Sequence, residues 1–231
     1  MYVVTTLLLI SWVDSPAGHY HAWKDGRVLH RDLSEDNLMV YSVDNAKKVK
    51  GVVNDWDMSS KLGEDGNVIR SAAVHRTGTA PFMARDLLQE GVAWPHFYRH
   101  DMESLFYILV WAAVHYSLEN EEQNRTKINS GKIHPELSQW MGEHRESYKV
   151  MFLLDDDKKD SIFSHIGKEF KDVKEEWLEP LWNLFNNAYS KKLKWNPHDT
   201  THDYATYDGK LTFETFMAAM GVTPRGNSVV V

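Results

Sequence analysis

Nearly every residue from Met102 to Val114 is apolar, which predicts a buried helix. Every residue from Leu105 onward in this run is apolar or aromatic, so the helix would have almost no polar face. A helix that is apolar all round is buried all round, and this run is too short to cross a bilayer. We therefore expect a central helix around which the rest of a domain packs.

Shorter helical patterns fill the second half of the chain. Trp177 to Ala188 places its apolar residues on a broad helical face. Pro135 to Trp140 and Glu143 to Leu154 are predicted as helices as well. Thr212 is a typical N-cap and Gly221 a typical stop, which predicts a last helix between them. The chain is therefore expected to be mainly α-helical.

Strand patterns are found near the start of the chain. Leu38 to Tyr41 and Val49 to Val53 have the composition of strands, and the polar residues 42–48 between them predict a β-hairpin. Residues 58–75 are polar and contain two glycines, which indicates a loop with a possible short hairpin. A small hairpin set in a mainly helical domain is the fold class that these patterns favour.

The first residues are harder to assign. Tyr2 to Val13 is apolar and predicts a buried strand or helix; its β-branched content favours a strand, though Leu7 to Ile10 could belong to a helix. No basic residue precedes this stretch and it is too short to span a bilayer, so neither a signal peptide nor an anchor is expected. Asp14 to Gly18 predicts a turn, and His19 to Asp25 predicts a helix that ends at Gly26.

Composition narrows the class of protein. The 231 residues suit one domain or one large lobe. The absence of Cys excludes disulfides and Cys-based metal or nucleophile sites, and it is compatible with a reducing compartment. The formal net charge of -7 argues against non-specific binding of nucleic acid. We expect a protein without nucleic-acid or membrane partners.

One octapeptide carries specific chemistry. Residues 30–37, His-Arg-Asp-Leu-Ser-Glu-Asp-Asn, match the catalytic loop of protein kinases at every fixed position. In that loop the Asp accepts the proton of the attacking hydroxyl, and the Asn five residues later holds magnesium. Asp32 and Asn37 take these positions, and His30 is interpreted as a packing and backbone-orienting residue. Asp55, after the predicted hairpin, falls where the second magnesium-binding acid belongs.

Two further segments follow in kinase order. Residues 76–86 resemble the end of a kinase activation segment, with Phe82 in place of Tyr and Arg85-Asp86 in place of Pro-Glu. Asp101 opens the predicted central helix, at the place where kinases carry the Asp that anchors the catalytic-loop backbone. Four elements in the right order make a chance match of the octapeptide a poor explanation.

Regulation is a separate question that the same segment raises. Arg31 precedes the predicted base, which leaves open control by phosphorylation of Ser71, Thr77 or Thr79. Thr79 is better explained as a structural residue that hydrogen-bonds the region of the catalytic Asp.

The residues of these motifs resemble those of the fungal-type protein kinase family. The resemblance rests on the Ser after the loop's Leu, Asp-Trp-Asp, Thr-Gly-Thr-Ala-Pro-Phe-Met-Ala and Asp-Met-Glu-Ser-Leu. It implies a mainly α, kinase-like C-terminal lobe over residues 19–221, with the activation segment at 55–86, a lead-in at 1–18 and a disordered tail at 222–231. It also implies an intracellular protein, in the cytoplasm or nucleus, with ATP and magnesium as cofactors and Ser/Thr hydroxyls of proteins as acceptors.

The chain departs from the kinase pattern in two ways. No Gly-rich loop and no strand Lys precede His30, and Lys24, the one Lys there, lies in the predicted helix before the loop. The N-terminal β lobe is therefore expected to be absent or vestigial here, and a partner could supply it or regulate the chain. Ser34 stands where Ser/Thr kinases carry a Lys that contacts the transferred phosphate, whose loss would remove electrostatic stabilisation of the transition state.

Other interpretations fit less well. Residues 203–214 fail as a calcium loop because Ala205 and Tyr207 stand where ligands are needed. His19 with His21, and His96 with His100, have metal-like spacings but no third ligand nearby. A catalytically impaired kinase-like scaffold stays open as an alternative. A small-molecule phosphotransferase would use the same pattern of Asp, Asn and Asp, but residues 77–84 are typical of a segment that binds a peptide acceptor.

Overall fold

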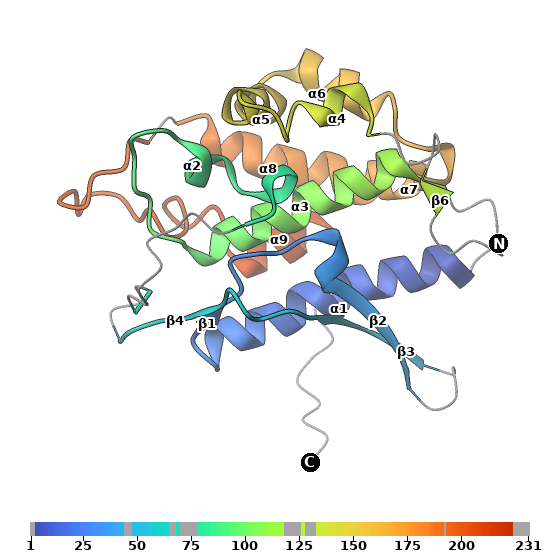
Figure 1. The fold of residues 1–231 in the computed structure, drawn as a ribbon, viewed down its shortest axis with the longest axis horizontal. Coiled ribbons are helices and arrows are strands. Elements are labelled where there is room, and N and C mark those ends of the chain that lie inside the picture. The colour runs from blue at the N-terminus through green and yellow to red at the C-terminus, as the bar shows by residue number, and fades with distance from the viewer. Residues whose placement is uncertain are drawn as a thin grey trace.

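A computed structural model describes residues 3–43, 48–64, 68–69, 78–117, 126–127, 133–191 and 193–223. In Figure 1, helix α3 (Tyr98–His115) crosses the middle of the fold. On one side of it lie α1 (Val3–Lys24) and a β-hairpin, and on the other side lie helices of the second half of the chain. The predicted fold class, mainly helical with few short strands, is confirmed at this level.

The remaining helices are short. They are α2 (Arg85–Leu88), α4 (Pro135–Ser138), α5 (Arg145–Leu154), α6 (Asp156–Phe163), α7 (Lys171–Val173), α8 (Glu179–Tyr189) and α9 (Phe213–Ala219). A π-helical turn, Lys174–Leu178, joins α7 to α8, and 3-10 turns cover Glu35–Asn37, Ala80–Phe82 and Lys168–Phe170.

The strands form three antiparallel pairs within the described residues. They are β1 (Val28–Leu29) with β4 (Ser60–Lys61), β2 (Leu38–Val43) with β3 (Lys48–Val53), and β5 (Tyr116–Ser117) with β6 (Thr126–Lys127). The predicted hairpin is confirmed as β2 and β3, whose register sets Leu38 opposite Val53. This register brings the end of the predicted catalytic loop next to the start of the segment that carries Asp55.

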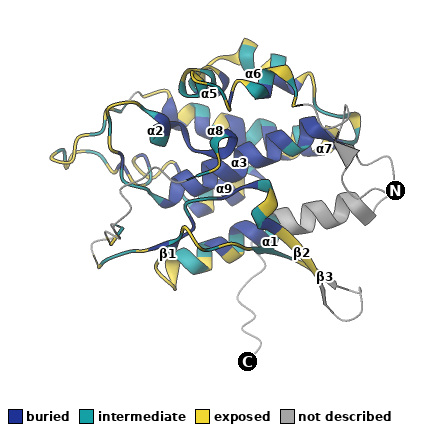
Figure 2. Ribbon diagram, viewed as in Figure 1, coloured by how far each residue is buried: buried dark blue, intermediate teal, exposed yellow. Residues whose placement is uncertain are grey.

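The predicted central helix is confirmed, and α3 is buried along nearly all of its length (Figure 2). Phe106 has no exposed surface and stacks on Phe152 of α5 and Phe185 of α8, with ring centroids 5.9 and 5.2 Å apart. Aromatic pairs at this spacing add to the free energy gained from burying their area. Helix α3 is therefore the support against which the other layers are placed.

The favoured strand over 2–13 and the turn over 14–18 were both wrong, because residues 3–18 lie in α1, as the helical alternative for Leu7 to Ile10 had allowed. Pro16 lies inside the helix, at a cost of about 3 kcal/mol in a helix interior. Packing offsets that cost, since Val13, Ala17 and Tyr20 lie against the core at helical spacing and Ser15 is fully buried. α1 also runs through the expected domain boundary at residue 18.

The end of α1 also differs from the prediction of a Gly26 cap. The helix ends at Lys24, and it is Arg27, with φ of 53°, that adopts the left-handed conformation. Gly26 has another constraint, because a Cβ there would lie 2.7 Å from the Ala22 carbonyl oxygen. Only glycine fits this close approach without a shift of the backbone.

The last helix has the cap that the sequence predicts. The Thr212 hydroxyl accepts a hydrogen bond from the Thr215 amide at 3.2 Å, and the Thr212 amide donates to the Thr215 hydroxyl at 2.9 Å. Thr212→Ala is expected to lower the free energy of unfolding by about 1 kcal/mol, because an amide of the first turn loses its acceptor. Urea unfolding measures this, with Thr200→Ala, at an exposed position, as the control. Equal unfolding midpoints for the two variants would contradict the capping role.

Candidate functional site

The loop from His30 to Asn37 is tied to α3 through one carboxylate. Asp101 Oδ2 accepts hydrogen bonds from the amides of His30 and Arg31, at 3.1 and 3.4 Å. Asp101 lies in the first turn of α3 and is 1 % exposed. The structure therefore places Asp101 where it can anchor the backbone of the predicted catalytic loop.

Two histidines complete the surroundings of Asp101. His19 Nε2 of α1 donates to Oδ2 at 2.9 Å, and His96 Nε2 donates to Oδ1 at 2.7 Å. Burial alone would raise the pKa of Asp101, but the charge of His96 and the hydrogen bonds from both histidines outweigh it, so the pKa lies well below its ordinary value. The His19 and His96 rings thus hold a buried anion and not a metal ion.

Asp32, the predicted base, is oriented by Thr79. Asp32 Oδ1 accepts hydrogen bonds from the Thr79 amide at 2.9 Å and from the Thr79 hydroxyl at 2.8 Å. The Asn37 side-chain amide donates to the Asp32 carbonyl oxygen at 2.9 Å. Thr79 therefore contacts the residue that the sequence interpretation linked it to, and the two bonds fix the direction of the carboxylate.

Asn37 and Asp55 lie at the same end of the β2–β3 hairpin. The Asn54 amide donates to the Asn37 carbonyl oxygen at 2.8 Å, directly beyond the Leu38–Val53 pair. Asp55 comes next, is exposed, and has φ of 57°. A left-handed conformation is uncommon for Asp, and such backbone strain gathers at functional sites.

The oxygens of these two residues suit magnesium. The side-chain nitrogen of Asn37 bonds to the loop backbone. The side-chain oxygen of Asn37 and the Asp55 carboxylate are hard ligands of the kind that magnesium prefers. Among the described residues, no group of three or more His, Cys, Asp or Glu could hold a metal by itself. A magnesium ion here fits the two side chains if phosphate oxygens supply its other ligands.

His30 packs beneath the Asp55 segment. Its Nε2 donates to the Asn54 carbonyl oxygen at 2.8 Å, and its ring meets Trp56 edge to face at 4.7 Å. Burial lowers the pKa of His30, which favours the neutral ring. Its Nδ1 also accepts a hydrogen bond from the Asp32 amide at 3.4 Å, so the ring contacts the backbone of both segments. Its backbone-orienting role in the reaction stays a prediction.

Arg31 and Ser34 lie on the loop with different surroundings. Arg31 has φ of 70°, and its Nη1 donates to the Ser60 hydroxyl of β4 at 2.6 Å. Ser34 is only 7 % exposed, so its hydroxyl is largely covered by the fold. The proposed phosphorylation sites Ser71 and Thr77 lie outside the described residues.

Asp86 is a buried structural residue at the end of the predicted activation segment. Its carboxylate is 2.7 Å from Arg99 Nη2 and 3.2 Å from Arg85 Nε. Burial alone would raise its pKa, but the facing charge of Arg99 and the His100 ring nitrogen, 3.8 Å from the carboxylate, lead the effects that hold it well below the ordinary value. Arg85-Asp86 thus forms a satisfied buried ion pair in place of the expected Pro-Glu.

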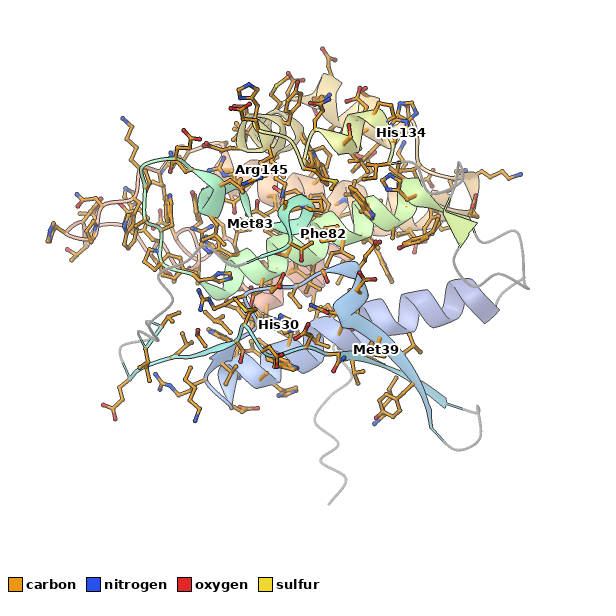
Figure 3. All side chains as sticks on the ribbon, in the orientation of Figure 1. His30, Met39, Phe82, Met83, His134 and Arg145 are labelled. Atoms are coloured by element: carbon orange, nitrogen blue, oxygen red, sulfur yellow. The ribbon has the colours of Figure 1, made fainter. Side chains whose placement is uncertain are left out.

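Three residues near this site carried no functional prediction. Met39 is 46 % exposed on β2, one residue after buried Leu38, and Figure 3 labels it on the hairpin. Glu103 and Lys149 are both fully buried behind the segment from Thr79 to Asp86. Strand alternation could have indicated the exposure of Met39, but nothing in the sequence shows which partners a buried Lys or Glu will meet.

A cavity of about 540 Å³ lies apart from these residues. Its walls include Tyr20 and Trp23 of α1, Tyr98 of α3 and Phe213 of α9. None of the predicted site residues lines it. We therefore do not assign it to the predicted reaction.

The fold and these contacts are compatible with part of a protein-kinase-like fold. The family model described as fungal protein kinase matches residues 5–113, just under half of the chain, and this match supports a relationship to that family over the matched range. The matched range holds the loop, the hairpin, the segment up to Asp86 and most of α3. A search of the curated proteins found no match. In the described part of the chain, no helix combines the length and apolar character needed to cross a membrane.

Proposed function

We propose that this chain is the acceptor-side part of a protein kinase that transfers the γ-phosphoryl group of ATP to Ser/Thr hydroxyls of proteins. The observation that carries the proposal is the orientation of Asp32. Thr79 occupies Oδ1 with two hydrogen bonds, while Oδ2 accepts none from any described residue. An oriented carboxylate with one unused oxygen can accept the proton of an attacking hydroxyl.

The remaining residues have supporting roles in this proposal. Asn37 and Asp55 would hold magnesium, which when bound with ATP would neutralise charge on the phosphates. Asp101 and His30 hold the loop in place. Thr79 belongs to the segment on which a protein acceptor would lie, and this favours a protein over a small-molecule acceptor. The test is transfer of labelled phosphoryl to a Ser/Thr protein acceptor by the chain together with a nucleotide-binding lobe.

The 231-residue chain is expected to bind the nucleotide weakly. Kinases hold the phosphates with a Gly-rich loop and a strand Lys, and no such motif precedes His30. We expect calorimetry to show that the chain alone binds magnesium-ATP more weakly than the low-micromolar range. Tighter binding would mean that other residues hold the nucleotide.

A kinase-like scaffold without transfer activity is the second candidate. It is favoured by Ser34, because the residue is nearly buried and presents no cation to a phosphate. The two candidates differ in one result, since a scaffold would not transfer phosphoryl even when a Gly-rich loop and a strand Lys are supplied. The upstream genomic sequence would show whether the gene encodes these elements.

A further inference from the structure

The segment between Thr79 and α2 is held from behind by two buried side chains of opposite charge. Lys149 of α5 donates from Nζ to the carbonyl oxygen of Met83. Glu103 of α3 accepts a hydrogen bond at Oε1 from the amide of Arg85 at 2.8 Å. The two bonds therefore hold the backbone on both sides of Ala84. Figure 3 labels Met83 in this segment and Arg145 at the start of α5 above it.

Tyr107 connects the two charged residues. Its hydroxyl donates to Glu103 Oε1 at 2.6 Å, and the Lys149 ammonium lies 4.1 Å from the centre of its ring. Glu103 Oε2 accepts a further bond from the Tyr189 hydroxyl at 2.5 Å. Lys149 and Glu103 both lie within the described residues and do not form an ion pair with each other. Their shared contacts with Tyr107 nevertheless couple their positions.

Burying Lys149 in this way is costly for the fold. Its side chain has no exposed surface, and Met83 is its one hydrogen-bond acceptor among the described residues. Burial lowers the pKa of Lys149 well below its ordinary value, and the charge of Glu103 only partly opposes this. Since the unfolded chain binds the proton more tightly, this residue lowers stability at neutral pH, and the penalty fades as pH rises toward the ordinary Lys value. An apolar side chain of the same length would avoid that cost.

We infer that Lys149 is a positioning residue for the acceptor-binding segment, acting with Glu103 as a clamp on the backbone of residues 83–85. The inference rests on the proposed function, because it assigns the clamped segment to the protein acceptor. The segment also reaches the predicted base, since the Met83 and Phe82 amides donate to the Thr79 carbonyl oxygen at 3.1 and 2.9 Å. A shift at Met83 is therefore transmitted to Thr79 and to the carboxylate it orients.

The test uses Lys149→Met in the 231-residue chain, with amide hydrogen exchange and urea unfolding measured together. We expect exchange of the amides from Thr79 to Arg85 to rise by about tenfold, the size of one lost hydrogen bond to a charged group. The unfolding midpoint should stay equal or rise, because the buried charge is removed. Lys171→Met is the control, since that side chain is 71 % exposed in a surface pair with Glu175.

Two outcomes would overturn the inference. Unchanged exchange in residues 79–85 would mean that Lys149 does not hold the segment, and a fall in the unfolding midpoint with faster exchange throughout would make it an ordinary structural residue. Glu103→Gln is a second test, since it should raise hydrogen exchange of the same amides. None of these measurements needs ATP. If the segment responds while the complete protein transfers no phosphoryl, the proposed function fails and the clamp stands.

Where transfer is measured, the same variant has a further signature. Lys149→Met should raise the KM for the protein acceptor and lower kcat, with the KM for ATP unchanged. An equal rise in the KM for ATP and in the KM for the acceptor would contradict a role confined to acceptor binding.

Discussion

Asp32→Asn is expected to lower phosphoryl transfer by about 100-fold to 10,000-fold, the range in which a positioned general base contributes. The Asn amide has nearly the same shape and can still accept the hydrogen bonds from Thr79, so the fold should be unaffected. What the variant loses is the negative charge and the oxygen that takes the proton of the hydroxyl. Transfer is measured with labelled ATP and a Ser/Thr acceptor, in the protein completed by its nucleotide-binding lobe.

Asp36→Asn is the matched control for this experiment. Asp36 lies on the same loop, in the turn Glu35–Asn37, is exposed, and has no role in the proposed reaction. It should keep nearly full activity, and both variants should unfold at the same urea concentration as the original chain. If Asp32→Asn retained activity, another group would have to be the base and the proposed mechanism would be wrong.

Asp101→Ala is expected to have the largest effect on stability, a loss of about 3–5 kcal/mol in the free energy of unfolding. The variant leaves the amides of His30 and Arg31 without their acceptor and leaves His19 and His96 buried without the anion they face. Removing one partner of a buried charged pair has a cost of this size. Urea unfolding measures it, with Asp172→Ala at an exposed position of α7 as the control. Equal losses for the two variants would show that Asp101 anchors nothing.

The same carboxylate gives a pH signature. Because the folded pKa of Asp101 lies well below its ordinary value of 3.8, its contribution is present above that value and is lost as pH falls through the folded pKa. Below pH 4 the original chain should therefore lose stability more steeply than Asp101→Asn. Parallel curves would contradict the low pKa. Asp101→Asn also serves as the milder variant if Asp101→Ala does not fold.

The fold was predictable where a local pattern was strong. The buried helix around Leu105 and Phe106, the hairpin after Asn37 and the cap at Thr212 all follow from short-range rules. α1 was not predictable, because Pro16 and Gly18 are helix breakers by local rules, and the helix is held by its packing against the β2–β3 hairpin and α3. That packing depends on contacts between distant residues, and no window of the sequence contains them.

The candidate site divides in the same way. Asp32, Asn37 and Asp101 were found from motif order, and the structure brings Asp32 and Asn37 together and ties their loop to Asp101. Their catalytic roles stay predictions. Lys149 and Glu103 were missed because a Lys and a Glu in helical segments have surface as their ordinary location. Only the fold shows that both are buried against one strip of backbone.

The anchor of the catalytic loop also has a consequence for how the chain is made. The amide of His30 and the carboxylate that holds it are 71 residues apart in the sequence. At about 5–20 residues per second, a ribosome needs roughly 4–14 s to add the residues between them. During that interval the loop has been synthesised while its anchor has not. The loop can therefore take its anchored shape only after α3 has emerged, and a chain released before that point would carry the motif without its geometry.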